Sequence, residues 1–176
     1  VLLENNLKNI SSTPEEIKKF ATIFSCDVTN QNSVKKIIKK ICETFGGIDI
    51  LISNAGAAWQ GSIGKVSDSL LKKSFDLNFY AHQYLSQEII KIFLAQKTQG
   101  ILLYNISKQS IDPGINFGPY GLPKASTLFL MRQYALEYGK FGIRANGVNA
   151  DRIRSGILTN KLISKRAKAR GLNKKD

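Results

Sequence analysis

Residues 48–56 read Ile48-Asp49-Ile50-Leu51-Ile52-Ser53-Asn54-Ala55-Gly56, an apolar run that ends in polar and small residues. Its length and its isoleucine content predict a strand buried on both faces, because a strand with one wet face would alternate apolar and polar positions. Upstream, residues 32–45 place apolar side chains on one helical stripe and end at Gly46, which is a typical stop signal. The stripe consists of Val34, Ile37, Ile38, Ile41 and Phe45.

The same alternation of strand and helix continues in both directions along the chain. Strands are predicted over residues 1–4, 22–28, 48–53, 101–107 and 143–149, and helices over 32–45, 67–96 and 120–138. Strands that alternate with helices predict a parallel sheet covered by helices, which is a doubly wound α/β fold. Residues 1–176 contain no repeat and no linker, so we expect a single domain.

Length and composition restrict the class of protein further. With 176 residues, 43% of them hydrophobic, the chain can bury one sizeable core. No run approaches the roughly 20 apolar residues of a membrane-spanning helix. Cys26 and Cys42 have no CxxC spacing, and His82 is the only histidine, so neither a disulfide framework nor a metal site is expected. We therefore expect a cytoplasmic protein with no membrane partner.

The formal net charge of +13 has two interpretations. A basic surface could bind nucleic acid, which would give a steep salt dependence of binding. The lysines are scattered in pairs, however, and the dense basic segment at 161–175 has no aromatic residues to stack on bases. We therefore favour solvated helix faces and expect no nucleic-acid partner.

Polar and small residues recur where the predicted strands end. Asp27, residues 54–56, Ser107 and residues 149–155 all lie at or just after the carboxyl end of a predicted strand. In parallel sheets, ligands bind outside the carboxyl ends of the strands. This placement predicts a ligand site at that edge.

The sequence Tyr120-Gly121-Leu122-Pro123-Lys124 carries the strongest chemical signal. An i to i+4 spacing places a phenol and an ammonium on one helical face. A tyrosine that works as acid and base near pH 7 needs its pKa lowered by roughly 3 units, and a nearby lysine favours the phenolate. Alone, this spacing is weak, because many helices carry it by chance.

Further motifs accompany it in a consistent order. They are Cys26-Asp27-Val28, Ser53-Asn54-Ala55-Gly56, Asn78 in Asp76-Leu77-Asn78, Asn105-Ile106-Ser107, and Tyr120 with Lys124. Taken together, these motifs resemble the short-chain dehydrogenase/reductase family, which implies a Rossmann-like fold and hydride transfer between a nicotinamide cofactor and an alcohol or carbonyl compound.

The resemblance implies four catalytic residues. Tyr120 resembles the proton donor and acceptor, and Lys124 the residue that lowers the tyrosine pKa and holds the nicotinamide ribose. Ser107 would polarise the substrate oxygen, with Ser110 as the fallback because Lys108 replaces the usual second serine. Asn78 would keep a water in a proton relay.

The resemblance also implies a set of cofactor contacts. Glu4, placed like the acid that binds the adenosine ribose, favours NAD over NADP because its charge opposes a 2′-phosphate. Besides Glu4, Tyr120 and Lys124, the implied contacts are Asp27, Val28, Asn54, Ala55, Gly56, Ile153 and Ser155.

A closer resemblance concerns the dehydrogenase module of bifunctional aldolase/short-chain dehydrogenase proteins. Residues 107–110, 116–124 and 149–156 carry it, and it implies a role in sugar catabolism. The family usually associates through its long helices, here 67–96 and 120–138, so a homodimer or homotetramer is implied. The alternative is a non-catalytic homologue that serves as a binding or assembly module.

One family signature has no counterpart here. The sequence contains no glycine-rich fingerprint, because the glycines at 61 and 64 follow the wrong strand and have the wrong spacing. We therefore expect a partial sequence that lacks the first strand with its phosphate-binding loop, and also the last strand. Such a chain alone is expected to fold marginally and to bind NAD poorly.

Overall fold

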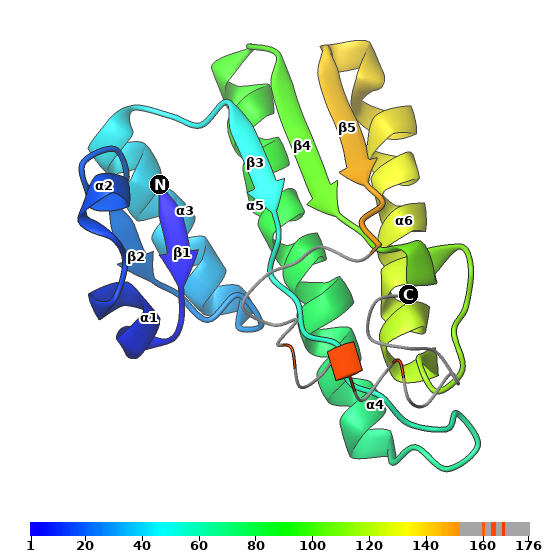
Figure 1. The fold of residues 1–176 in the computed structure, drawn as a ribbon. Helices are drawn as coiled ribbons and strands as arrows, with labels where there is room; N and C mark the ends of the chain where they lie inside the picture. Colours follow the sequence, from blue (N-terminus) through cyan, green and yellow to red (C-terminus); the bar gives the residue numbers. More distant parts are fainter. Residues whose placement is uncertain (152–159, 161–162, 165–166, 168–176) are drawn as a thin grey trace.

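The computed structural model describes residues 1–151 together with residues 160, 163, 164 and 167 (Figure 1). The elements, in chain order, are β1 (Leu2–Glu4), α1 (Leu7–Ser11), α2 (Glu15–Lys18), β2 (Ile23–Ser25), α3 (Gln31–Phe45), β3 (Ile50–Ser53), α4 (Asp68–Phe75), the π-helical turn η1 (Asp76–Tyr80), α5 (Ala81–Gln96), β4 (Gly100–Asn105), the 3₁₀ turn η2 (Lys108–Ser110), α6 (Gly118–Tyr138), the 3₁₀ turn η3 (Gly139–Phe141) and β5 (Ile143–Val148).

Every strand pair is parallel, which confirms the predicted doubly wound α/β fold. The strands form two hydrogen-bonded groups, β1-β2 and β3-β4-β5, which lie next to each other in Figure 1. Glu4 pairs with Ser25 in the first group, and Ser53 pairs with Tyr104 in the second. Within the described residues, no strand joins β1 to β3.

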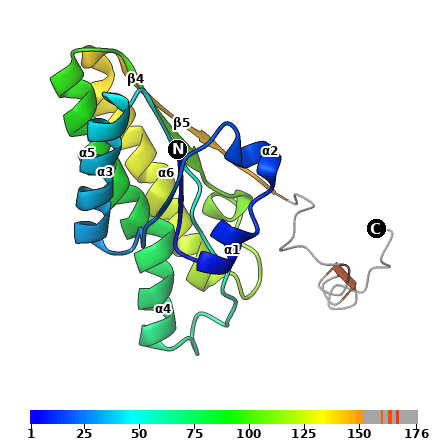
Figure 2. The same ribbon diagram turned by 90° about the vertical axis from the view of Figure 1, so that its left-hand side faces the viewer.

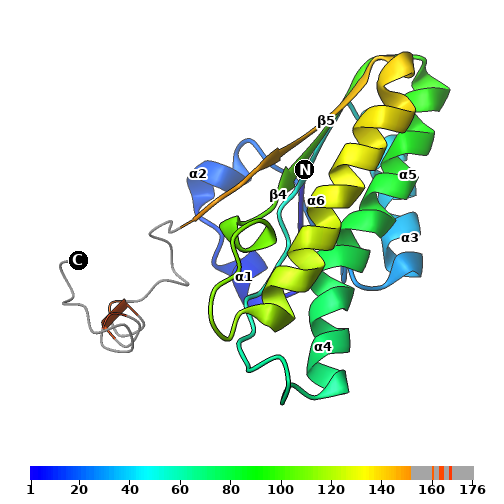
Figure 3. The ribbon, with the colours of Figure 1, turned by 90° about the vertical axis from the view of Figure 1, so that its right-hand side faces the viewer.

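Helices lie on both faces of the strands (Figures 2 and 3). Helices α3, α5 and α6 form one layer, and the short helices α1 and α2 lie on the other side, near β1 and β2. The core lies under the three long helices and includes Val34, Ile89, Phe93 and Leu102, each at most 1% exposed. No helix among the described residues is long and apolar enough to cross a bilayer.

The expectation that residues 48–53 are buried on both faces is wrong for one face of β3. Ile50 and Ile52 are 56% and 66% exposed, whereas Ser53 is buried. The long helices cover only the opposite face, and α1 and α2 lie over β1 and β2 instead. The isoleucines therefore present an uncovered apolar surface.

Helix α3 follows its sequence signals closely. The Asn30 side chain caps it by accepting a hydrogen bond from the Ser33 amide, and Gly46 ends it at a φ of +84°, which glycine adopts without strain. Four of the five predicted stripe residues are buried. The fifth, Phe45, is 51% exposed because it lies at the last helical position, beyond the packed face.

Helix α5 holds the start of β3 through one carboxamide. The Gln96 Oε1 atom accepts a hydrogen bond from the Ile48 amide at 2.8 Å, and Gln96 Nε2 donates to the Ile48 carbonyl at 2.8 Å. The side chain thus pairs with this backbone segment as a neighbouring strand would. Such a clamp matters here because, among the described strands, β3 pairs only with β4.

We expect Gln96→Ala to lower the free energy of unfolding by about 1–2 kcal/mol, because two partly buried backbone groups lose their partners. Chemical denaturation is the measurement. Gln87→Ala is the matched control, since Gln87 is an exposed residue on the same helix. Equal effects of the two substitutions would show that the clamp adds nothing to stability.

Candidate active site

The predicted site residues lie at one edge of the strands. Because all the strands run parallel, their carboxyl ends point the same way. Glu4 ends β1, Asp27 follows β2, Asn54 follows β3, and Ser107 follows β4. The fold therefore places every described candidate on this edge or on the adjoining helices.

Tyr120, Lys124 and Ser107 converge in space. A hydrogen bond links the side chains of Ser107 and Tyr120. The Lys124 Nζ atom lies 5.9 Å from the centroid of the Tyr120 ring and donates a hydrogen bond to the Asn105 carbonyl at 2.8 Å. Tyr120 lies in the first turn of α6, and Lys124 follows one turn later, so the helix sets their relative position.

Burial governs the protonation of both groups. It lowers the pKa of Lys124 from its ordinary 10.5 to about 8. It also raises the pKa of Tyr120, and the hydrogen bond from Ser107 opposes that rise only in part. The expected lowering of the tyrosine pKa by lysine is therefore not seen, because loss of solvent outweighs the other contributions.

Ser107 and Ser110 have different surroundings. Ser107 is 8% exposed, and its hydroxyl accepts a hydrogen bond from the Gln109 amide at 3.2 Å in addition to its bond with Tyr120. The Ser110 hydroxyl donates to the Ser107 carbonyl at 2.7 Å. Ser110 therefore supports the turn that carries Ser107, and Ser107 is the serine in contact with Tyr120.

Asn78 lies in the π-helical turn and is fully buried. Its Oδ1 atom accepts a hydrogen bond from the Ala57 amide at 3.1 Å, and its Nδ2 atom donates to the Ala57 carbonyl at 2.9 Å. This carboxamide holds the segment after β3, as Gln96 holds the segment before it. Both ends of β3 are thus held by hydrogen bonds to one continuous helical segment, formed by η1 and α5.

Gly56 has no room for a side chain. A Cβ atom at this position would lie 2.9 Å from Asn78 Oδ1 and 3.4 Å from Lys124 Nζ. The backbone after β3 therefore approaches both predicted catalytic side chains closely, and glycine permits this without a shift of the Asn78 carboxamide.

We expect Gly56→Ala to destabilise the protein by about 1–3 kcal/mol, because the Asn78 carboxamide must move and is held by its bonds to Ala57. Gly64→Ala is the matched control, since a Cβ there meets nothing within 4 Å. Thermal unfolding of the two variants is the measurement. A Gly56→Ala protein as stable as the Gly64→Ala protein would contradict the close approach.

The residues assigned to the adenosine side form a separate group. The Glu4 carboxylate accepts a hydrogen bond from the Asn6 amide at 2.9 Å, which lowers its pKa. Asp27 Oδ1 accepts bonds from the amide and the hydroxyl of Thr29 at 2.9 and 2.7 Å. Val28 packs at the margin of the core.

The remaining cofactor candidates divide into two sets. Asn54 Oδ1 accepts a hydrogen bond from Asn105 Nδ2 at 2.7 Å, which links the ends of β3 and β4, and Ala55 is half-buried beside it. Ile153 and Ser155 lie outside the described residues.

One buried polar pair beside the site has no signature in the sequence. Ser53 Oγ lies 2.6 Å from His82 Nδ1, and the Nε2 atom of this fully buried histidine has no partner among the described residues. Burial, and then the charge of Lys124, lowers the His82 pKa to about 3, so the ring is neutral near pH 7. A lone histidine without ligand-spaced neighbours carried no signal for this contact.

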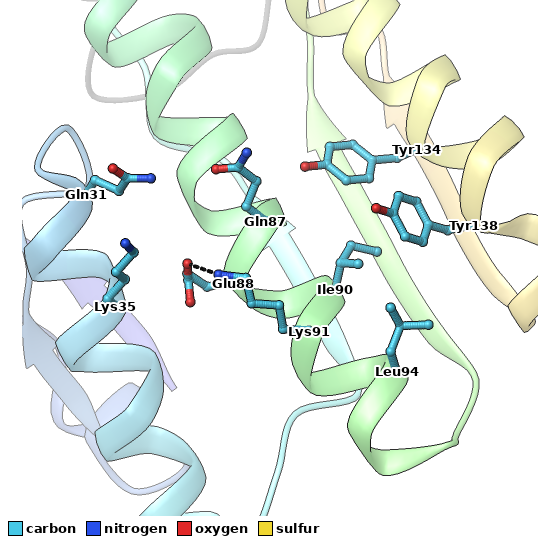
Figure 4. Close-up of a pocket in the computed structure, with 9 residues that line it drawn as sticks. All are labelled: Gln31, Lys35, Gln87, Glu88, Ile90, Lys91, Leu94, Tyr134 and Tyr138. Carbon is cyan, nitrogen blue, oxygen red and sulfur yellow. Dashed lines mark hydrogen bonds and ion pairs between the residues drawn. The ribbon is translucent and has the colours of Figure 1, made fainter.

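A separate groove lies on the outer surface of the helical layer (Figure 4). Helices α3, α5 and α6 line it with side chains that include Lys35, Glu88, Tyr134 and Tyr138. None of the predicted site residues contributes to it.

A parallel sheet with helices on both faces, and a tyrosine, a lysine and a serine gathered at its carboxyl edge, define a doubly wound α/β protein of the Rossmann type. A family profile described as "short chain dehydrogenase" matches residues 1–165. The chain belongs to the short chain dehydrogenase family, whose members are NAD(P)-dependent oxidoreductases.

Curated relatives agree with this assignment. Sorbose reductase SOU1 from Candida albicans is 29% identical over 141 residues, which cover 78% of this chain and 50% of the relative. A probable 2,4-dienoyl-CoA reductase from Bacillus subtilis is 28% identical over 173 residues, covering 96% and 68%. The uncharacterized oxidoreductase YuxG from Bacillus subtilis is 31% identical over 138 residues, covering 77% and only 20%. The chain thus spans half or less of two of these relatives.

Solved structures confirm the fold. Sorbitol-6-phosphate 2-dehydrogenase SrlD from Erwinia amylovora superposes with a TM-score of 0.87 at 21% identity, covering 98% of this chain and 70% of that one. ElxO with NADP bound superposes with a TM-score of 0.85 at 20% identity, covering 93% and 67%.

Proposed function

We propose that this chain is part of an enzyme that catalyses reversible hydride transfer between NAD and an alcohol or carbonyl substrate, with Tyr120 as acid and base. The observation that carries the proposal is the convergence of Tyr120, Ser107 and Lys124 at the carboxyl edge of the strands. A bound nicotinamide would accept or supply the hydride.

The proposed roles follow from the contacts of each side chain. The Tyr120 hydroxyl donates a proton to a substrate carbonyl oxygen, or takes one from an alcohol, and the hydrogen-bonded Ser107 hydroxyl orients the same oxygen. Lys124, whose Nζ atom lies 5.9 Å from the Tyr120 ring centroid, keeps a positive charge beside Tyr120 and holds the nicotinamide ribose. Asn78 holds the turn at Ala57 and keeps a water for the proton relay.

We assign two regions of the edge to the two ends of a dinucleotide. Asn54, Ala55 and Gly56, whose backbone approaches Lys124 closely, take the nicotinamide end. The family resemblance implies Ile153 and Ser155 as further contacts there. Glu4, Asp27 and Val28 take the adenosine end. The lowered pKa of Glu4 keeps its carboxylate charged, and this charge supports NAD over NADP. ElxO, a structural neighbour, binds NADP, so the ratio of kcat/KM values for the two cofactors is the test.

The pyrophosphate has no glycine-rich loop in this sequence. We therefore propose that residues 1–176 form part of one cofactor-binding domain and, alone, bind NAD weakly and are inactive. A cooperative thermal transition together with micromolar NADH affinity of the 176-residue chain would contradict this.

The decisive experiment uses the protein expressed from its complete gene. NADH oxidation with a panel of sugars, hydroxyaldehydes and other carbonyl compounds is expected to reveal turnover. Cofactor binding without turnover on any substrate would favour the alternative, a non-catalytic binding or assembly module.

The substrate class that we favour is the sugars and small hydroxyaldehydes. The aldolase-fusion resemblance supports it, and the stretch aligned with YuxG is only 20% of that protein, which leaves room for further modules there. The intact mass from the native source tests the fusion, because an added aldolase module would raise it far above 19.5 kDa. Two free cysteines support a reducing, cytoplasmic setting.

We also propose that the protein forms a homodimer or homotetramer through the long helical segments 67–96 and 120–138, which contain α4, α5 and most of α6. The supporting feature is a stripe on α6 at seven-residue spacing, formed by Leu122, Phe129 and Leu136, which are 46%, 64% and 78% exposed. Light scattering of the complete protein and of a Phe129→Lys variant tests this proposal. A monomeric unchanged protein would contradict it.

A further inference from the structure

We propose that the Thr127 hydroxyl is a positioning group, which ties helix α6 to Asn78 and so fixes Tyr120 and Lys124 relative to the turn after β3. Thr127 is fully buried, and its Oγ1 atom lies 2.7 Å from the Asn78 carbonyl oxygen. The expected effect on catalysis rests on the proposed function. The contact between Thr127 and Asn78 is independent of it.

A local role explains only part of what this hydroxyl does. Thr127 Oγ1 also lies 3.0 Å from the Pro123 carbonyl, four residues earlier in the same helix. Serine and threonine commonly make that bond in helices, and Ser126 makes it to Leu122 at 3.1 Å. A hydroxyl has one proton, so Thr127 donates to one carbonyl at a time. The shorter bond is the one that leaves the helix and reaches Asn78.

The Thr127–Asn78 hydrogen bond completes a closed series of contacts around the site. Asn78 holds Ala57 with its side chain and is held by Thr127 at its backbone. Gly56, the residue before Ala57, lies close to both Asn78 Oδ1 and Lys124 Nζ. Lys124 lies three residues before Thr127 on α6, so both belong to one rigid helical turn.

Without the Thr127 hydroxyl, this series of contacts is interrupted between α6 and Asn78. The π-helical turn that carries Asn78 would then rest on α6 through packing alone, and Ala57 would follow any movement of Asn78. The Asn54–Gly56 turn and the Tyr120–Lys124 pair would lose their fixed relation.

Three substitutions in the protein from the complete gene separate the possibilities. Thr127→Val keeps the shape and removes the hydroxyl, and Thr127→Ser keeps the hydroxyl. Ser126→Ala removes only a local helix bond and is the matched control. The readouts are the kcat and KM of the carbonyl reaction and the hydrogen-exchange rate of the Ala57 amide, which donates to Asn78.

We expect Thr127→Val to lower kcat roughly 10- to 100-fold with little change in KM, as loss of reactive geometry does. We also expect faster exchange at Ala57. Thr127→Ser should restore both readouts, and Ser126→Ala should leave both unchanged. If Thr127→Val does not fold, Thr127→Cys, with its weaker donor, takes its place.

Normal kcat and normal Ala57 exchange in Thr127→Val would overturn the proposal, as would a Thr127→Ser protein no better than Thr127→Val. If the unchanged protein shows no turnover on any substrate, the proposed function fails. The Ala57 exchange rates of the same variants still decide whether Thr127 positions Asn78.

Discussion

Tyr120→Phe is expected to abolish most turnover while leaving the protein folded and able to bind NADH. The substitution removes one hydroxyl, the group hydrogen-bonded to Ser107, and keeps the ring beside Lys124. A positioned acid or base contributes about 10²–10⁴ to a rate, so kcat should fall by that factor. The measurement is steady-state NADH oxidation in the protein from the complete gene, with cofactor affinity measured by fluorescence titration.

Tyr138→Phe is the matched control, because it makes the same change at the far end of the same helix. It should retain full activity. If Tyr120→Phe kept its kcat, Tyr120 would not be the proton donor, and the convergence of three side chains would need another explanation. If NADH affinity fell together with kcat, the hydroxyl would serve binding of the cofactor more than proton transfer.

The pH dependence of the reaction rate tests the role of Tyr120 in a second way. Burial raises the Tyr120 pKa, so near pH 7 the phenol is protonated. That form suits proton donation to a carbonyl, and alcohol oxidation needs the phenolate. Oxidation should therefore increase toward alkaline pH more steeply than reduction does.

Local patterns in the sequence were enough to predict the fold, whereas the roles of the site residues came from the family resemblance. Alternating periods predicted the parallel strands, and the Tyr120–Lys124 spacing predicted two side chains on one helical face, both as found. Ser107 meets Tyr120 because the end of β4 and the start of α6 lie at the same edge. Short-range patterns therefore predicted the elements and the helical pair, but not the contact between Ser107 and Tyr120.

Contacts between distant segments were not predictable in this way. The Gln96 clamp on Ile48 and the Asn78 clamp on Ala57 join residues 48 and 21 positions apart, and neither has a local signature. The expected lowering of the Tyr120 pKa considered only its lysine neighbour and omitted burial, which acts in the opposite direction. Burial arises from the whole fold and cannot be read from a four-residue spacing.

Lys124→Met is expected to stabilise the protein near pH 7 while removing activity. Lys124 is 2% exposed, and burial lowers its pKa from 10.5 to about 8, so keeping its charge in the folded state is costly. At ~1.4 kcal/mol per pKa unit, this difference corresponds to about 3 kcal/mol. Loss of the hydrogen bond to the Asn105 carbonyl offsets about 1 kcal/mol of that gain. The net expectation is a gain of about 2 kcal/mol in unfolding free energy.

The gain should disappear as the pH rises. Below about pH 8, Lys124 is protonated in both the folded and the unfolded state, so the full cost of burying its charge lowers the stability of the folded protein. Between about 8 and 10.5 the unfolded chain binds the extra proton, so the stability of the unchanged protein rises with pH relative to Lys124→Met. Urea denaturation at pH 7 and pH 9.5 measures this, with the exposed Lys65→Met as the control. If the difference in unfolding free energy between Lys124→Met and the unchanged protein were the same at both pH values, burial of the Lys124 ammonium would not lower the stability of the folded protein. The cation beside Tyr120 would then have no cost in stability.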